Sequence, residues 1–132
     1  MSIETLCNEN LPYDVQVIRG PLAPHEVIEA QRRLYLDPNR DMSRPVLWDS
    51  RRMKGDAPAT DVFRMVDDST ELWSQMSGGR SAILVAGRNH VAPARLYAKL
   101  AEAMPRSLGI FTSYEEAVAW LMDDYPDVAR AS

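Results

Sequence analysis

The chain has very little cysteine and histidine, the residues that build disulfide frameworks and most zinc centres. It contains 1 cysteine and 2 histidines among 132 residues. The lone Cys7 cannot form an internal disulfide, which favours a reducing compartment. Neither a Cys-x-x-Cys nor a His-Glu-x-x-His motif occurs, and these are the spacings typical of zinc sites. We therefore expect no metal and no cofactor.

Lysine and long apolar runs are also scarce. Lysine occurs only at Lys54 and Lys99, the other cations are scattered arginines, and the formal net charge is −4. This balance argues against nucleic acid as the partner, because phosphate binding needs clustered lysine and arginine. No apolar run approaches the roughly 20 residues of a membrane span, and the first residues lack the pattern of a signal peptide. These absences predict a cytoplasmic protein with no membrane span.

What the sequence does have is the composition of one globular domain. Apolar residues make up 45% of the chain and charged residues 26%, which is ordinary for a water-soluble fold. A chain of this length buries about 68% of its unfolded surface. We therefore treat residues 1–132 as a single domain.

From residue 44 onward, short apolar strands alternate with amphipathic helices. The expected order is strand 44–48, helix 60–77, strand 81–86, helix 89–104, strand 107–111 and helix 113–124. This order predicts parallel strands joined by crossover helices. The run 82–86 is apolar without alternation, as in a strand covered on both faces, so we place it at the centre of the sheet.

The first third of the chain predicts an antiparallel strand pair and a helix. Residues 3–7 and 13–18 are the expected strands, and residues 24–36 are the expected helix. Between 13 and 17, apolar side chains alternate with Asp14 and Gln16, the period of a strand with one buried face. The fold class is thus α/β, a mixed sheet of about five strands with an antiparallel N-terminal pair and about four helices.

Two hydroxyl residues stand near expected helix starts. Ser113 precedes Glu116 by three residues, the capping-box pattern. Thr60 is the only hydroxyl close to the start of the helix 60–77, and we interpret it as the N-cap of that helix. On the same helix, Trp73 falls on the apolar face, which predicts a core position.

The chain resembles the SpoIIAA-like group of STAS-type domains, which are small bacterial proteins. The resemblance covers nearly the whole chain, and two segments carry it most clearly. The L-W-D at 47–49 is similar to the strand-ending L-x-D of that group, and the F-T-S-Y-E-E-A-V-A-W-L at 111–121 is similar to its closing helix. These are fold-like patterns and not active-site signatures.

The resemblance implies a non-enzymatic regulatory or protein-interaction module. Anti-sigma factor antagonists of this group bind a kinase-type anti-sigma factor and are switched by phosphorylation of a serine in a D-S-x-G-like turn. The corresponding stretch 55–60 has no serine, and Ser50 lies several residues too early. We therefore assign phosphorylation to no residue. The alternative is a small-molecule or lipid-binding domain with an apolar cleft.

Polar residues at the carboxyl ends of the expected strands are the candidate binding residues, because ligands of open α/β sheets bind there. They are Asp49, Ser50, Arg51, Arg88, Asn89, His90 and Arg95. Free N–H groups at a helix start near Asn89, with Arg88 and Arg95 nearby, suit a small anionic ligand. In the alternative interpretation Asn89 caps the helix and both arginines face water.

Catalysis is the least favoured interpretation. The residue types of a nucleophilic triad are present at Ser50, His90 and Asp49, but no G-x-S-x-G elbow occurs. A deep apolar pocket would favour ligand binding. A flat surface with a symmetric dimer would favour the regulatory module, and a close pair of Asp49 and His90 in a cleft would favour an enzyme.

An apolar strip on the last helix is a candidate contact surface. Trp120, Met122 and Tyr125 share this part of the chain. If they are exposed together, they predict a partner protein or self-association. The alternative is that Trp120 packs against the edge of the sheet.

Overall fold

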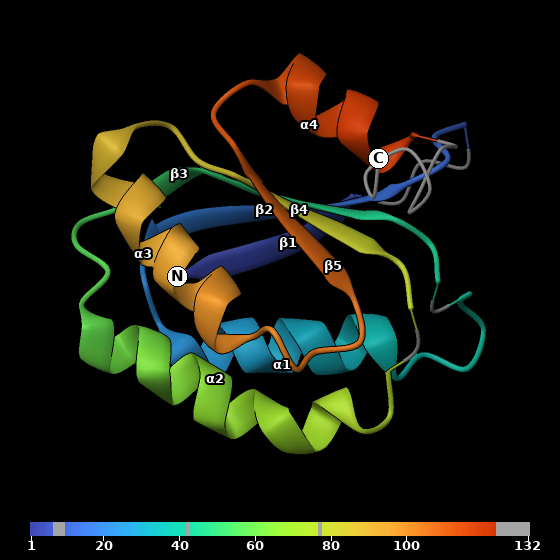
Figure 1. Cartoon of the computed structure of the whole chain (residues 1–132), viewed down its shortest axis with the longest axis horizontal. Coiled ribbons are helices and arrows are strands. Elements are labelled where there is room, and N and C mark those ends of the chain that lie inside the picture. The colour runs from blue at the N-terminus through green and yellow to red at the C-terminus, as the bar shows by residue number, and fades with distance from the viewer. Residues whose placement is uncertain (7–9, 42, 77, 124–132) are drawn as a thin grey trace.

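A five-stranded sheet in the order β1-β2-β3-β4-β5 organises the protein. The computed structural model describes residues 1–6, 10–41, 43–76 and 78–123. The elements, in chain order, are β1 (Ser2–Leu6), β2 (Asp14–Pro21), α1 (Pro24–Tyr35), β3 (Val46–Lys54), α2 (Ala59–Trp73), β4 (Arg80–Leu84), α3 (Arg88–Leu100), β5 (Ser107–Phe111) and α4 (Tyr114–Leu121) (Figure 1).

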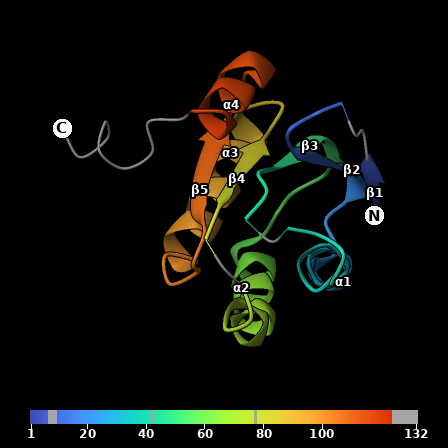
Figure 2. The same ribbon diagram turned by 90° about the vertical axis from the view of Figure 1, so that its right-hand side faces the viewer.

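The sheet is mixed and covered on both faces. β1 pairs with β2 in antiparallel fashion, and β2 to β5 are parallel to one another. α1, α2 and α3 contribute to one core layer, and α4 packs on the opposite face against β3, β4 and β5 (Figures 1 and 2). This architecture confirms the expected mixed sheet with an antiparallel N-terminal pair and four helices.

β3 is longer than the sequence predicted. The expected strand ended at Trp48, but β3 continues to Lys54 by pairing with the far part of β2. β4 ends at Leu84, opposite Asp49, so the outer part of β3 has only β2 beside it. Arg51 and Arg52 can therefore reach solvent from within a strand, and such polar residues are easily mistaken for a loop.

β4 does not lie at the centre of the sheet. β3 is the central strand, and β4 is second from the edge. The prediction that both faces of β4 are covered is nevertheless confirmed. Ala82 and Leu84 pack in the cluster beneath α4, whereas Ile83 and Val85 face the helices on the other side. Coverage from both faces produces the continuous apolar run, whatever the position of the strand in the sheet.

The prediction that β2 buries one face only is wrong. Asp14 is 9% exposed and Gln16 1% exposed. Two guanidinium groups surround the Asp14 carboxylate, with Arg44 Nε 3.0 Å away and Arg40 Nε 2.5 Å away. Gln16 Oε1 accepts a hydrogen bond of 3.0 Å from Thr5 on β1. These partners allow polar side chains to be buried inside a strand.

The two hydroxyls near helix starts behave differently. The Ser113 hydroxyl accepts a 3.3 Å hydrogen bond from the Glu116 N–H, which confirms the predicted cap of α4. α2 instead begins after Pro58, whose backbone is extended at φ −61° and ψ 148°. Thr60 is thus already the second helical residue, and its interpretation as the N-cap is wrong.

Of the predicted tryptophan positions, Trp73 is buried in the core beneath α1–α3, as expected. Trp120 packs against Phe111 of the edge strand, with ring centroids 5.6 Å apart, and the Arg80 guanidinium lies 5.3 Å from its ring centre. This favours packing on the sheet edge over an exposed strip.

Tyr125 and Cys7 lie outside the described residues. No helix in the described ranges is long and apolar enough to cross a bilayer.

Candidate functional site

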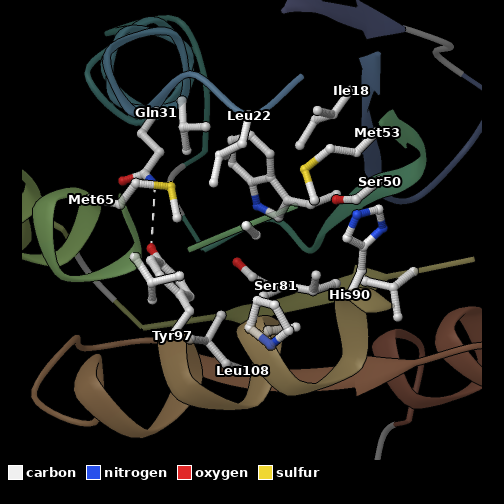
Figure 3. Close-up of a pocket in the computed structure, with 18 of the residues that line it drawn as sticks. Ile18, Leu22, Gln31, Ser50, Met53, Met65, Ser81, His90, Tyr97 and Leu108 are labelled. Atoms are coloured by element: carbon white, nitrogen blue, oxygen red, sulfur yellow. Dashed lines mark hydrogen bonds between the residues drawn. The ribbon is translucent and has the colours of Figure 1, made fainter. Parts of the chain in front are cut away.

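A cavity of about 110 Å³ lies between the sheet and the layer of α1, α2 and α3. Figure 3 shows its walls, with Leu22 and Gln31 on the α1 side and Tyr97 and His90 on the α3 side. The cavity exists because several of the side chains that meet there are small. These are Ser50 from β3, Ala57 from the following loop, Ser81 from β4, and Ala94 from α3.

The remaining lining is mostly apolar and partly adaptable. Four methionines, Met1, Met53, Met65 and Met104, lie in the wall. Methionine is unbranched and changes rotamer easily, so such walls can repack around occupants of different shape. Trp48 adds a flat aromatic surface, which lies against Tyr35 at a ring distance of 6.4 Å.

A shift in the register of the sheet brings Met53 to the same face as Ser50. Val17 pairs with Asp49, but Arg19 pairs with Arg52, so β3 carries one extra residue between them. Side chains of a regular strand alternate between faces, and an extra residue reverses the alternation. As a result Ser50 and Met53, three residues apart, both line the cavity.

His90 and Ser50 form one polar end of the cavity (Figure 3). His90 Nε2 lies 2.8 Å from the Gly55 carbonyl oxygen. A carbonyl oxygen only accepts, so Nε2 carries a proton, and in the neutral form of the ring Nδ1 is then an acceptor. Within the described residues the Ser50 hydroxyl has no hydrogen-bond partner, although Ser50 is only 5% exposed.

A second polar contact joins α1 and α3 across the cavity wall. Gln31 Nε2 donates to the Tyr97 hydroxyl at 3.4 Å. Tyr97 as a whole is half-buried, but its hydroxyl end points inward (Figure 3), and burial raises the pKa of Tyr97 to about 12. The phenol therefore stays protonated at physiological pH and can act as a donor.

No side chain of Asp, Glu, Lys or Arg is among the described residues that line the cavity. The buried Arg106 guanidinium lies behind the wall, where it donates to Ser81. An ion in the cavity would lose its hydration with no charged side chain in the wall itself, which costs several kcal/mol. The cavity therefore suits an uncharged molecule. Among the described residues, no cluster of three or more His, Cys, Asp or Glu could hold a metal ion.

The candidate residues predicted from the sequence separate into three places. Ser50 and His90 line the cavity. Asp49 and Arg51 lie on the opposite face of the sheet, where the Arg51 guanidinium is 5.8 Å from the ring centre of Tyr114 in α4. Three further candidates on α3 are exposed: Arg88, Asn89 and Arg95. Asp49, Ser50 and Arg51 were expected to follow the end of their strand, but they lie inside β3.

Asp49 is fully engaged by its neighbour. Arg51 Nη2 and Nε each lie 2.9 Å from a carboxylate oxygen of Asp49. The hydrogen bonds from Arg51 hold the pKa of Asp49 below its ordinary value, and the pKa of Arg51 is raised in turn. A carboxylate in this state is a poor general base, and it lies across the sheet from His90.

The first turn of α3 does not follow the expected capping. The N-cap is Gly87, with no side-chain hydrogen bond, and Asn89 is the second helical residue. The interpretation of Asn89 as the cap is therefore wrong. The exposed Arg88 and Arg95 agree with the alternative that both arginines face water.

The comparisons with known proteins bear on the fold. No protein-family model matches the chain, and no curated protein matches it. Among solved structures, it is similar to an uncharacterized protein of the DUF3478 family, with a SpoIIAA-like fold, from Shewanella loihica PV-4. The two share a TM-score of 0.55 and 19% sequence identity over 91% of this chain and 92% of that chain. The fold is SpoIIAA-like.

This likeness confirms the fold expected from the L-W-D strand and the closing helix. At this level of identity it establishes the fold alone, so the SpoIIAA-like architecture leaves the activity to be argued from the site. The cavity residues that sequence reasoning missed include Gln31 and Tyr97. Gln31 had a signal, since it lies four residues after Val27 on the apolar side of α1. Tyr97 lies three residues after the buried Ala94 on α3, and nothing in the sequence marked an empty space beside it.

Proposed function

We propose that this SpoIIAA-like domain is a non-catalytic binding protein for a small, uncharged and mainly apolar molecule. The observation that carries the proposal is the cavity of about 110 Å³ between the sheet and α1–α3. Dry apolar cavities of roughly 150 Å³ are known to take up a benzene ring. A space of similar size with methionine in its walls is therefore suited to a molecule of about one ring.

The size of the cavity favours a small ligand over a long acyl chain. Pockets that enclose drug-sized molecules measure about 300–1,000 Å³, several times the present volume of about 110 Å³. A lipid tail would require α2 or α3 to move away from the sheet. We therefore narrow the alternative of a small-molecule or lipid-binding domain to its small-molecule form.

The separation of polar groups favours binding over catalysis. Nucleophilic catalysis needs a base that is oriented by a third group, next to an oxyanion-stabilising site. His90 uses Nε2 to hold the Gly55 carbonyl, and the carboxylate of Asp49 is bound to Arg51 on the other face. Ser50 and His90 thus have no third partner of this kind among the described residues.

A substitution that fills the cavity tests the proposal. Ala94 lines the cavity on α3 and is 8% exposed, whereas Ala92 on the same helix is exposed. We expect Ala94→Leu to weaken toluene binding at least tenfold, because the added carbons occupy the space that the ligand needs. Ala92→Leu, which makes the same change on the solvent side, should alter the affinity less than twofold. NMR titration of each variant with toluene measures both.

Two results would contradict the proposal. One is the absence of saturable toluene binding to the wild-type protein. The other is equal binding by the Ala94→Leu variant, once its folded state is verified by its NMR spectrum.

A protein-interaction module remains the second candidate, and one observation favours it. Phe63 on α2 is 48% exposed, and Arg88 and Asn89 at the start of α3 are exposed as well. The bond from His90 to Gly55 ties the start of α3 to the loop before α2. Exposed aromatic and arginine side chains are enriched in many contact surfaces. On this interpretation the domain is a regulatory module of the anti-sigma factor antagonist type, or it self-associates.

This second candidate is testable with surface variants. We expect Phe63→Ala and Arg88→Ala each to reduce recovery of a specific partner from the native cell at least fivefold, whereas Lys99→Ala at the far end of α3 should not. Sedimentation of the purified protein tests self-association through the same surface. Unchanged recovery and an unchanged oligomeric state in both surface variants would eliminate this surface as the contact.

A further inference from the structure

We propose that the bound molecule carries a hydroxyl group on a single neutral ring, and that Ser50 receives this hydroxyl. The inference rests on the proposed function and adds the chemical class of the ligand. It assigns Ser50 as a specificity residue, with the apolar walls holding the ring.

The first argument is the state of the Ser50 side chain. Ser50 is 5% exposed, and its hydroxyl has no hydrogen-bond partner among the described residues. The oxygen is not among the fully enclosed side-chain atoms that lack a partner, so it is open to a small molecule. Ser50 lines the cavity, and its hydroxyl points to the same end as His90 (Figure 3). A polar group inside the cavity therefore has this hydroxyl as an unpaired partner.

The second argument is the backbone beside Ser50. β3 carries one extra residue between Asp49 and Arg52, in the segment that begins with Ser50. Bulges interrupt the hydrogen-bond ladder, and they recur next to binding sites because they redirect a side chain. Ser50 shares the face of Trp48 by regular alternation, and the bulge brings Met53 to the same space. Regular pairing would have sent the side chain at position 53 to the other face.

The third argument is the choice of polar group on the ligand. Nε2 of the His90 ring beside Ser50 donates to the Gly55 carbonyl oxygen, and the neutral form of the ring presents Nδ1 as an acceptor. The serine hydroxyl can donate or accept. A ligand hydroxyl also does both, so it can pair with Ser50 in either direction. A carboxylate or an ammonium group would enter a wall without a charged side chain and would lose its hydration uncompensated.

The fourth argument is the shape of the apolar part. The volume of about 110 Å³ is too small for more than roughly one ring. Trp48 supplies a flat face, and the adaptable Met53 and Met65 close the sides. The geometry thus matches a phenol-like molecule, with the ring among the methionines and the hydroxyl at Ser50.

The experiment compares phenol with toluene, which differ by a hydroxyl in place of a methyl group. We define selectivity as the dissociation constant of toluene divided by that of phenol, each measured by NMR titration. Wild-type protein is expected to bind phenol at least as tightly as toluene. Ser50→Ala should lower the selectivity about fivefold, the size of one net hydrogen bond, and change toluene affinity less than twofold.

Ser69→Ala is the matched control. Ser69 is 0% exposed and its hydroxyl is also unpaired, but it lies on α2 away from the cavity lining. This variant should keep the wild-type selectivity. Selectivity that survives Ser50→Ala, or falls equally in Ser69→Ala, would overturn the inference, as would toluene binding without phenol binding. In each of those cases toluene still binds, so the proposed function stands. If neither compound binds, both ideas fail together.

Discussion

Replacing Arg106 with leucine is expected to lower the free energy of unfolding by about 3–5 kcal/mol. Arg106 is 5% exposed and lies where the parallel strands begin. Its Nε donates to the Ser81 hydroxyl at 3.0 Å, and its Nη2 donates to the carbonyl oxygens of Arg44 at 3.1 Å and Arg80 at 2.8 Å. One side chain therefore satisfies acceptors at the starts of both β3 and β4.

The cost arises from the groups left behind. Leucine fills much of the volume, but the two carbonyl oxygens and the Ser81 hydroxyl would lose a buried donor. The Arg106 guanidinium also lies 5.1 Å from the ring centre of Tyr35, and this cation–π contact would be lost as well. Burial lowers the pKa of Arg106 from its ordinary value, so burial itself already disfavours the charge. The hydrogen bonds are what make the charge tolerable there.

Urea unfolding with Arg95→Leu as the control measures this effect. Arg95 is exposed on α3, so its replacement should change stability by less than about 0.5 kcal/mol. The stability of the Arg106→Lys variant should be closer to that of Arg106→Leu than to that of the wild type, because an ammonium group cannot reproduce the planar set of donors. A loss below about 1 kcal/mol for Arg106→Leu would mean that the amino ends of the strands are held by other contacts.

The same network explains why the architecture could be predicted from the sequence better than the site could. Hydrophobic periodicity depends on neighbours along the chain, and it located every strand and helix of the SpoIIAA-like fold. It could not place Arg106, whose partners at Arg44 and Ser81 are distant in sequence. Likewise, Asp14 and Gln16 looked solvent-exposed because the sequence does not show that Arg40 and Thr5 pair with them.

The candidate site was only partly predictable for two physical reasons. Ser50 and His90 were identified as polar residues near strand ends, and both line the cavity. Asp49 was grouped with them, although neighbouring residues of a strand point to opposite faces. The register shift after Asp49 is a property of the pairing between β2 and β3, and no local sequence pattern predicts it. The cavity itself results from small side chains brought together from four separate segments.

Replacing Gly79 with alanine is expected to destabilise the fold by about 3 kcal/mol or more, because it adds both backbone strain and steric overlap. Gly79 has a φ of +144°, where a residue with a side chain is strained. An added Cβ would lie 2.8 Å from the Ser43 carbonyl oxygen and 2.5 Å from Arg106 Nη1. The methyl group would therefore push the guanidinium away from the acceptors described above.

Gly55→Ala separates backbone strain from crowding. Gly55 also has a positive φ, +76°, but an added Cβ there would meet nothing within 4 Å. Its replacement should cost only about 1–2 kcal/mol, the backbone penalty alone.

In Arg106→Leu protein the guanidinium is already absent, so Gly79→Ala should cost less there than in the wild type. A double-mutant cycle in urea measures this coupling. If Gly79→Ala costs the same free energy of unfolding in both backgrounds, backbone strain and the contact with Ser43 dominate the cost. The position of Arg106 would then not depend on the absence of a side chain at Gly79.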